Sequence, residues 1–310
     1  MNEVTASDIK IGVIGGSGLG TILGEHHGQP VATHFPDTPF GKPSGQILEV
    51  RVGGLPTFLL PRHGDGHLFN PSQVPYRANI FALKTLGVTH ILASCAVGSL
   101  REEFKPRDLV IPDQIIDKTR RPGTFFDEAA VHVEFAEPFC SVLRKLLGEL
   151  EADTVVHPAG CYVAMEGPAF STKAESHMHR IWGGGLIGMT GMPEAKLARE
   201  AEIAYAMVAL VTDYDCWRTP PKDAPPKEDD SLLEEIIGNL DAASKSALAL
   251  ISNAIEKIAA SPADFASPAH HALKRAIWSD KTKIPKETVD RLAPLWLKYL
   301  VPSPGTPGEG

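Results

Sequence analysis

Short apolar runs alternate with segments of helical periodicity along most of the chain. Each run is at most nine residues long, which is too short for a typical helix and favours a buried strand. We therefore predict strands at residues 11–14, 90–95, 108–111, 161–165, 186–189 and 203–211. Residues 46–51 and 57–60 flank Gly53-Gly54 and predict a hairpin.

Segments with the apolar spacing of amphipathic helices lie between and after these strands. The helix predicted at 172–182 has the clearest start, because Thr172 and Glu175 form a capping-box pattern. Gly87 suits the C-terminal end of a helix at 72–86, and Pro193 suits a first helical position. The other helices are predicted at 137–151, 193–202, 231–260 and 286–299.

The alternation of strands and helices predicts the α/β class, with helices on both faces of one sheet. We expect one large domain at residues 8–260, a helical C-terminal extension at 261–300 and a disordered tail at 301–310. Residues 219–230 (TPPKDAPPKEDD) have the composition of a loop or linker inserted within the domain. Two independent domains are the weaker interpretation.

Charge and composition narrow the possible partners. The 310 residues carry 30 Lys+Arg and 38 Asp+Glu, a net charge of −8, which disfavours nucleic-acid binding because phosphate neutralisation needs basic excess. No apolar run approaches the roughly 18 residues of a membrane span, and residues 1–10 lack the pattern of a secretory signal. Four cysteines without CxxC spacing argue against a disulfide framework or structural zinc, and favour a reducing cytoplasm.

A glycine-rich turn, GGSGLG at residues 15–20, directly follows the first strand. Its backbone amides could bind phosphate oxygens, and Ser17 adds a hydroxyl at the apex. Thr21 stands where a dinucleotide-binding fingerprint requires glycine, and the Lys-Ser/Thr ending of a P-loop is absent. By itself the turn supports phosphate binding and a plain tight turn equally.

Arg62 and His63 follow an apolar strand and form a second candidate anion site. Arginine offers a planar fork of donors that fits phosphate. A surface ion pair with a solvated histidine is the alternative that these two residues alone favour. His63 and His67 have a spacing that could suggest a metal site. Gly64 and Gly66 argue against a helix that presents both imidazole rings, and no third ligand is apparent.

Further candidates lie where predicted strands end, the edge at which open α/β sheets bind ligands. Residues 94–99 (SCAVGS) are small enough for a ligand to approach the backbone, or for tight core packing. Phe170 could stack on a flat heterocycle, although such a side chain more often belongs to the core. Asp213 and Asp215 could protonate and orient a leaving group, or could be loop carboxylates or a metal-binding Asp-x-Asp. Together these positions indicate a site for phosphate and a planar base.

Seven motifs, read in order, resemble those of the 5′-methylthioadenosine phosphorylases, a branch of the trimeric purine nucleoside phosphorylases. The motifs most specific to this branch are PRHGDGHLFNPSQVPYRANIFALKTLG (61–87) and TDYDCW (212–217). The others are IGGSGL (14–19), SCAVGSLREE (94–103), AEPFC (136–140), MEGPAFSTKAES (165–176) and MTGMPEAKLARE (189–200). The resemblance covers about residues 8–260 and gives no match beyond them.

The resemblance implies a central mixed, twisted sheet, a homotrimer, and phosphorolysis of methylthioadenosine to adenine and 5-methylthioribose 1-phosphate. Phosphate is then a co-substrate, and neither a cofactor nor a metal is implied. Asp213 matches the residue that shares a proton with purine N7, and Asp215 matches the one at the 6-amino group. The matched phosphate contacts are Ser17, Arg62, His63, Cys95, Ala96 and Thr190. The matched nucleoside contacts are Phe170, Met189 and, from a neighbouring subunit, His132, and Ser171 lies next to Phe170. Leu233, Ile236 and Ile237 are expected to form the walls of a dry pocket for the apolar methylthio group.

Two residues depart from the family pattern: Cys95 replaces a common Thr or Ser, and Ala169 replaces a common Arg. The nearest alternative function is phosphorolysis of a 6-oxopurine nucleoside such as methylthioinosine, inosine or guanosine. A dinucleotide-dependent oxidoreductase built on the glycine turn is an alternative from another enzyme class. A nucleoside-binding protein without phosphate capture is the non-enzymatic alternative.

Overall fold

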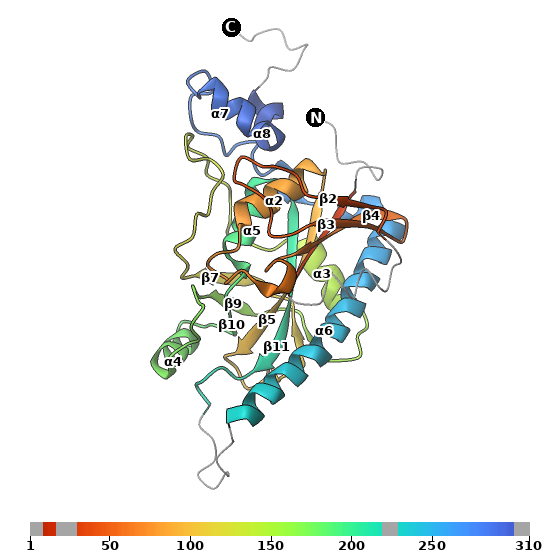
Figure 1. Cartoon of the computed structure of the whole chain (residues 1–310), viewed down its shortest axis with the longest axis vertical. Helices are drawn as coiled ribbons and strands as arrows, with labels where there is room; N and C mark the ends of the chain where they lie inside the picture. Colours follow the sequence, from red (N-terminus) through yellow and green to blue (C-terminus); the bar gives the residue numbers. More distant parts are fainter. Residues whose placement is uncertain (1–8, 17–29, 219–228, 301–310) are drawn as a thin grey trace.

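The computed structural model describes residues 9–16, 30–218 and 229–300, without the side chains of residues 229–233. Within these residues, an eleven-stranded mixed sheet is covered by helices on both faces (Figure 1). The predicted fold class is therefore confirmed. Ser17, most of the 219–230 insert and the 301–310 tail lie outside the described residues.

Four parallel strands form the centre of the sheet. β1 (Ile11–Gly15) lies between β4 (Leu55–Pro61) and β5 (His90–Ser99), and β11 (Ala204–Asp213) pairs with β5. Nine of the ten residues of β11 are buried, because both of its faces are covered. A strand covered in this way needs apolar residues at consecutive positions, which explains the uninterrupted apolar run in the sequence.

Shorter strands extend the sheet on both sides. β3 (Ile47–Val52) pairs antiparallel with β4 and with β2 (Ala32–His34). The end of β5 pairs antiparallel with β10 (Leu186–Gly188), which continues in parallel into β9 (Cys161–Ala164) and β7 (Gln114–Asp117). β6 (Leu109–Val110) joins β11 to β8 (Val156–His157).

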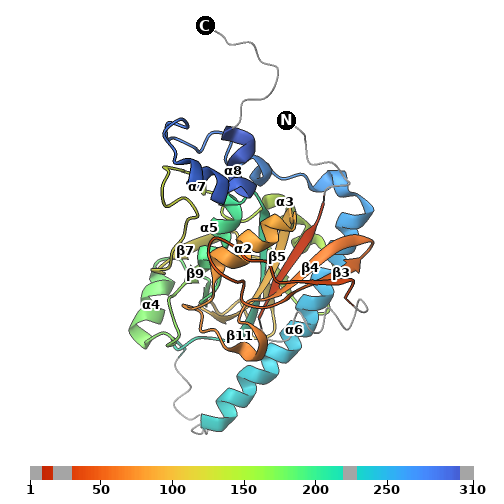
Figure 2. The same ribbon diagram turned by 45° about the horizontal axis from the view of Figure 1, so that its top comes forward.

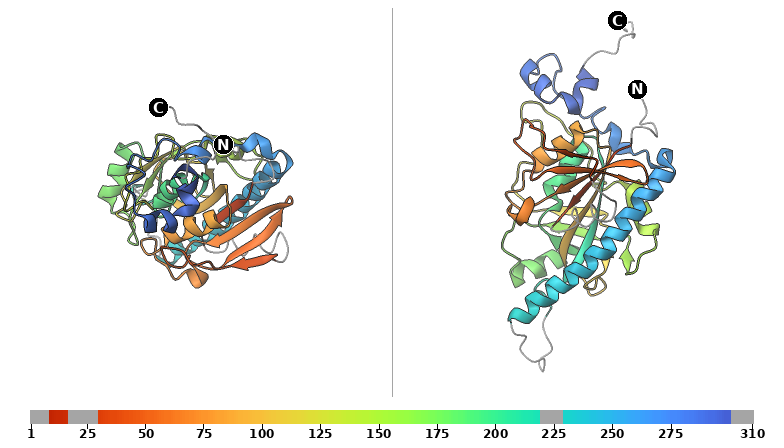
Figure 3. Two further views of the ribbon diagram at one scale, coloured as in Figure 1. Left: turned by 90° about the horizontal axis from the view of Figure 1, so that it is seen from above. Right: turned by 45° about the vertical axis from the view of Figure 1, so that its right-hand side comes forward.

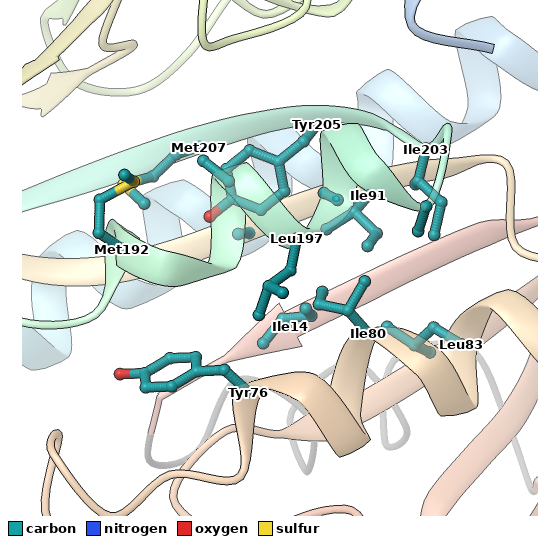
Figure 4. Close-up of a cluster of buried hydrophobic side chains, with 14 of the residues drawn as sticks. Ile14, Tyr76, Ile80, Leu83, Ile91, Met192, Leu197, Ile203, Tyr205 and Met207 are labelled. Carbon is teal, nitrogen blue, oxygen red and sulfur yellow. The ribbon is translucent and has the colours of Figure 1, made fainter. Parts of the chain in front are cut away.

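The two faces of the sheet carry separate hydrophobic clusters. Along β11, Tyr205 and Met207 belong to one cluster, whereas Ala206 and Val208 belong to the other. The first cluster is covered by α2 (Tyr76–Thr85) and α5 (Gly191–Glu200), and Figure 4 shows Ile80 of α2 and Leu197 of α5 gathered near Ile14 of β1. The second is covered by α3 (Ser141–Glu149) and α6 (Asp229–Ala260), which runs alongside the sheet (Figure 3).

The C-terminal extension packs on the first cluster, next to α2 (Figure 2). It comprises η3 (Pro262–Phe265), η4 (Pro268–His271), α7 (Lys286–Arg291) and α8 (Ala293–Leu300). Glu202 ties it to the sheet, because its Oε1 accepts from the Leu273 N–H at 3.0 Å and from Tyr299 Oη at 2.7 Å. Leu273 and Trp296 are fully buried, so the extension shares the core of the large domain.

Several predicted helix boundaries were wrong. The helix expected from residue 72 begins at Tyr76, because residues 70–74 form a turn on the Asn70 carbonyl and Pro75 is the N-cap. The helix expected from 137 begins at Ser141. The helix expected at 286–299 divides at Leu292, since Pro294 has no N–H to continue the ladder. α6 begins at Asp229, inside the predicted insert.

The helix α4 (Lys173–Ile181) has the predicted capping box, with the Thr172 side chain accepting from the Glu175 N–H. In α5, regular helical geometry starts only after Met192, whose φ and ψ are −121° and 140°, so Pro193 occupies the first regular position. In the described part of the chain, no helix is both long and apolar enough to cross a bilayer.

Candidate active site

The candidate residues gather where the strands end, as predicted. Arg62 follows β4 and donates through its backbone N–H to Gly15 of β1 at 2.9 Å. Asp213, the last residue of β11, lies opposite Gly98 of β5. Beyond β9 and β10, Met165 N–H donates to the Gly188 carbonyl at 2.9 Å. One edge of the sheet therefore brings together residues from six strands.

Arg62 is fully buried and bound to Glu194 of α5. Its Nε and Nη2 donate to the two carboxylate oxygens at 2.8 and 2.9 Å, and Nη1 donates to the Ser94 carbonyl at 2.7 Å. Burial opposes the charge of Arg62, but Glu194 more than offsets this, so the pKa of Arg62 is raised. Tyr205 Oη also donates to Glu194 at 2.8 Å. The result is a rigid, buried network at the bottom of the site.

His63 is a neutral histidine. Its Nδ1 lies 2.8 Å from the Phe69 carbonyl, and because a carbonyl only accepts, Nδ1 carries the hydrogen. Burial lowers the pKa of His63 to about 4, with smaller contributions from the neighbouring Arg62 and His67. Nε2 is therefore an acceptor at neutral pH. The His67 ring stacks on His63 at 4.1 Å.

Cys95 and Ala96 lie side by side on β5 but in opposite environments. Cys95 is buried, with Sγ 3.2 Å from Met207 Sδ, and burial raises the pKa of its thiol to about 11. The thiol is thus protonated and unsuited to nucleophilic catalysis. Ala96 is exposed although Cys95 and Val97 on either side are buried. Solvent therefore reaches the centre of the sheet at this residue.

Thr190 is buried at the end of β10, close to the Cys95 side chain. Its backbone N–H and that of Gly191 both donate to Tyr162 Oη, at 3.2 and 3.3 Å. The same hydroxyl lies 4.0 Å from Cys95 Sγ. Four of the predicted phosphate residues therefore lie close together in the structure: Arg62, Cys95, Ala96 and Thr190.

Asp213 and Asp215 form the other end of the site. Burial raises the pKa of Asp213, although Thr212 Oγ1 and the Asp215 N–H donate to its carboxylate at 2.6 and 2.7 Å. Asp215 adopts a positive φ of 50°, and its Oδ2 is buried without a hydrogen-bond partner among the described residues. An unpartnered buried acceptor is unfavourable unless a ligand supplies a donor.

The remaining nucleoside candidates lie around these carboxylates with varied exposure. The Ser171 carbonyl accepts from Cys216 Sγ at 3.2 Å, one residue beyond Asp215. Met189 is partly buried, and its Sδ lies 2.5 Å from where a Cβ on Gly167 would be, so a side chain at residue 167 would displace that of Met189. Phe170 is 84 % exposed, so its ring does not belong to the core.

The structure does not bring every candidate to this edge. His132 is exposed and lies in the loop before α3, where its backbone N–H donates to Ala276 of the extension at 2.9 Å. Ile236 is partly buried and Ile237 is exposed, both in the first turns of α6. Leu233 lies on the same helix, but its side chain is outside the described residues.

Three functional neighbours escaped the sequence analysis. Glu194 pairs with an arginine 132 positions away, and the only available signal was a Glu at the start of the helix after MTG. Tyr162 and Tyr205 lie in strands and their apolar surroundings suggested core packing. Both belong to the core, and their hydroxyls also contact Thr190 and Glu194, respectively.

The part of the chain that the structure describes contains no cluster of three or more His, Cys, Asp or Glu side chains able to hold a metal ion. His63 and His67 stack face to face, an arrangement that does not converge both rings on one ion.

The sequence model of the Phosphorylase superfamily matches residues 10–256. The chain belongs to the phosphorylase superfamily.

Relatives within this superfamily match nearly the whole chain. An S-methyl-5′-thioadenosine phosphorylase of Thermosynechococcus vestitus is 47 % identical, covering 94 % of this chain and 99 % of the relative. A methylthioadenosine phosphorylase from an antarctic soil metagenomic library has a solved structure with a TM-score of 0.80 and 44 % identity, covering 93 % and 99 % of the two chains. The solved structure of the methylthioadenosine phosphorylase from Schistosoma mansoni in complex with adenine has a TM-score of 0.70 and 35 % identity. This match covers 87 % of this chain and 99 % of that one.

These similarities confirm the resemblance found in the sequence and extend it. A match over 94 % of the chain reaches past residue 260, where the sequence motifs gave no match. The C-terminal extension is therefore shared at least in part with this relative. Membership of the phosphorylase superfamily also speaks against the oxidoreductase alternative, which rested on the glycine turn.

Proposed function

We propose that the chain catalyses phosphorolysis of 5′-methylthioadenosine to adenine and 5-methylthioribose 1-phosphate. The observation that carries this proposal is the pair Asp213 and Asp215 at the end of β11. Asp213 has a raised pKa, and Asp215 has an unpartnered buried oxygen. A carboxylate that only accepts suits the N–H of a 6-amino group better than a 6-oxo group. The superfamily match and the methylthioadenosine phosphorylases among the relatives support the same assignment.

The reaction breaks the bond from the sugar C1′ to purine N9 and forms a bond from C1′ to a phosphate oxygen. Purine departure leaves an electron pair on the base, which protonation at N7 stabilises. A raised pKa lets Asp213 carry or share this proton, and the proton of hydrogen phosphate restores the balance. Adenine then leaves as the neutral base, and the sugar phosphate as a dianion.

Phosphate binding is proposed at the buried end, near Arg62, His63, Cys95, Ala96 and Thr190, with Ser17 from the glycine turn. Arg62 has five N–H groups, and its contacts with Glu194, Ser94 and Ile14 use four of them. The positive charge of Arg62 is balanced by Glu194, so the pair supplies little net charge to the anion. Discrete N–H and O–H donors, and not a broad basic surface, would therefore hold the anion, which fits the net charge of −8.

The decisive experiment incubates the purified chain with methylthioadenosine, with and without phosphate, and identifies the base and sugar products. We expect adenine and 5-methylthioribose 1-phosphate only when phosphate is present. Methylthioinosine, inosine and guanosine serve as matched substrates for the 6-oxopurine alternative. Cleavage of these nucleosides without cleavage of methylthioadenosine would overturn the assignment, and nucleoside binding without turnover would support the non-enzymatic alternative.

We also propose a homotrimer in which His132 completes the site of a neighbouring subunit. His132 is exposed, and its ring packs at 4.6 Å against Trp278, which is 72 % exposed. An exposed aromatic pair of this kind fits a surface that another subunit covers. Light scattering measures the mass of the assembly and so tests whether it is a trimer. Mixing inactive Asp213→Ala and His132→Ala subunits tests sharing, because mixed trimers should regain activity if the two residues act in one site.

No cofactor is proposed, since phosphate itself is the second substrate. A cytoplasmic location is also proposed. All four cysteines lie in described residues as free thiols, which suits a reducing compartment.

A further inference from the structure

Arg121 is a buried arginine that the proposed mechanism does not use. It follows β7, and its side chain is 4 % exposed. A guanidinium buried this deeply destabilises the fold unless hydrogen bonds replace its water. Its partners therefore show which parts of the molecule it holds together.

Four of the five acceptors of Arg121 lie in two turns of the candidate site. The base turn, residues 165–171, contributes the Glu166 carbonyl to Nη2 and the Glu166 carboxylate to Nε, the latter at 3.2 Å. The ribose turn, residues 189–192, contributes the carbonyls of Met189 and Met192 to Nη1, at 2.6 and 3.0 Å. Tyr76 Oη accepts from the same nitrogen at 2.8 Å.

These contacts begin where the sheet stops connecting the two turns. The pairing of β9 with β10 ends at Ala164 and Gly188, and the last backbone hydrogen bond runs from Met165 N–H to Gly188 at 2.9 Å. The next carbonyls, those of Glu166 and Met189, are both acceptors and cannot bond each other. Arg121 donates to both and so continues the connection through its planar fork.

We propose that Arg121 is a positioning residue that fixes the base turn relative to the ribose turn during phosphorolysis. This inference rests on the proposed function. The base turn carries Phe170 and Ser171, and the ribose turn carries Met189 and Thr190, so their separation sets how a nucleoside lies between base and phosphate contacts. Arg121 itself touches no substrate in this role.

The test is Arg121→Ala, with steady-state kinetics in which methylthioadenosine and phosphate are varied in turn. A displacement of about 1 Å between the turns lowers kcat/KM for the nucleoside by about 100-fold. Guanidinium ion at a concentration below that which unfolds the protein should restore much of the loss, because it can occupy the vacated fork. A residue needed only for folding would show no such rescue.

Arg144→Ala is the matched control. Arg144 on α3 also donates to a backbone carbonyl, that of Pro158 at 3.1 Å, but it contacts neither turn. We expect wild-type kinetics and no effect of guanidinium. Arg121→Lys keeps the charge without the planar fork, and should lose about tenfold in kcat/KM; this variant carries the test if the alanine variant does not fold.

Arg121 variants within threefold of wild type, or a loss that guanidinium leaves unchanged, would overturn the inference. A wild-type chain that releases no adenine would instead overturn the proposed function. Calorimetric binding of adenine then still tests Arg121, since weaker adenine binding by Arg121→Ala than by Arg144→Ala does not depend on turnover.

Discussion

The phosphate end and the nucleoside end of the candidate site are built in opposite ways. At the phosphate end, Arg62 and Glu194 are fully buried and their polar groups bond within the protein. At the nucleoside end, Phe170 and Ile237 are 84 % and 56 % exposed, and Asp215 keeps an unpartnered oxygen. The buried ion pair is therefore held in place without a ligand, whereas under the proposed function substrate or another subunit would contact the exposed and unpartnered groups of the nucleoside end.

Removing one partner of the buried Arg62–Glu194 pair should have the largest effect, a loss of stability. Glu194→Ala leaves the Arg62 guanidinium buried without its carboxylate, and such a loss destabilises by about 3–5 kcal/mol. Urea denaturation measures the free energy of unfolding. Arg62→Met combined with Glu194→Leu should recover most of this stability but not phosphate affinity. Wild-type stability of Glu194→Ala would show that the ion pair does not hold the phosphate end in place.

The carboxylates of the nucleoside end should affect activity more than stability. Asp213→Asn cannot donate a carboxylic proton, so we expect about a 100-fold loss of kcat/KM for methylthioadenosine and a smaller loss for methylthioinosine. Competition kinetics with the two nucleosides measures the ratio. Asp241→Asn, at an exposed ion pair with Lys245 on α6, is the control. An unchanged ratio in Asp213→Asn would contradict the role assigned to Asp213.

Phe170, which is exposed, should affect binding of the nucleoside and not that of phosphate. Phe170→Ala removes a stacking surface worth about 1 kcal/mol, and should raise the nucleoside KM by up to about tenfold while the phosphate KM is unchanged. Ile181→Ala is a matched control, because Ile181 is also 84 % exposed and lies on α4. Equal effects of the two substitutions would argue against stacking by Phe170.

Acid should lower stability through two buried histidines, His63 at the phosphate end and His270 in the C-terminal extension. The pKa of His63 falls from 6.5 to about 4, chiefly because of burial, as does that of His270. Between these values the unfolded chain binds protons that the folded chain does not, so stability falls as pH decreases from 6.5 toward 4. Urea midpoints across this window measure the slope, which should diminish in His63→Gln combined with His270→Gln. An unaltered slope would assign the acid sensitivity to other groups.

Sequence predicted the parts of the site that follow from local pattern. The strands ending at Arg62 and Asp213 are uninterrupted apolar runs, and a parallel sheet places such ends at one edge. The motif resemblance then supplied a role for each residue. Pro75 and Pro294 show the limit of periodicity, because both set helix boundaries inside segments whose apolar spacing continued without interruption.

Other parts could not be read from local pattern because they depend on distant partners. Arg62 and Glu194 are 132 residues apart, and no spacing rule connects them. The exposure of Phe170 is likewise decided by how the base turn leaves β9, and an apolar side chain alone suggested core. The extension joins the main core through Leu273 and Trp296, whereas the sequence predicted a helical extension without indicating what it packs against.

The helix α6 packs closely on the sheet along only part of its length. It has 32 residues and extends about 48 Å. Among its described side chains, the first buried one is that of Asn239, whose amide donates to the Thr212 carbonyl at 2.9 Å. Ile236 and Ile237 precede this residue and are less buried. Under the proposed function, groups of different length at the sugar 5′ position would change contacts at these turns and leave Asp213, on the strand that α6 covers, in place.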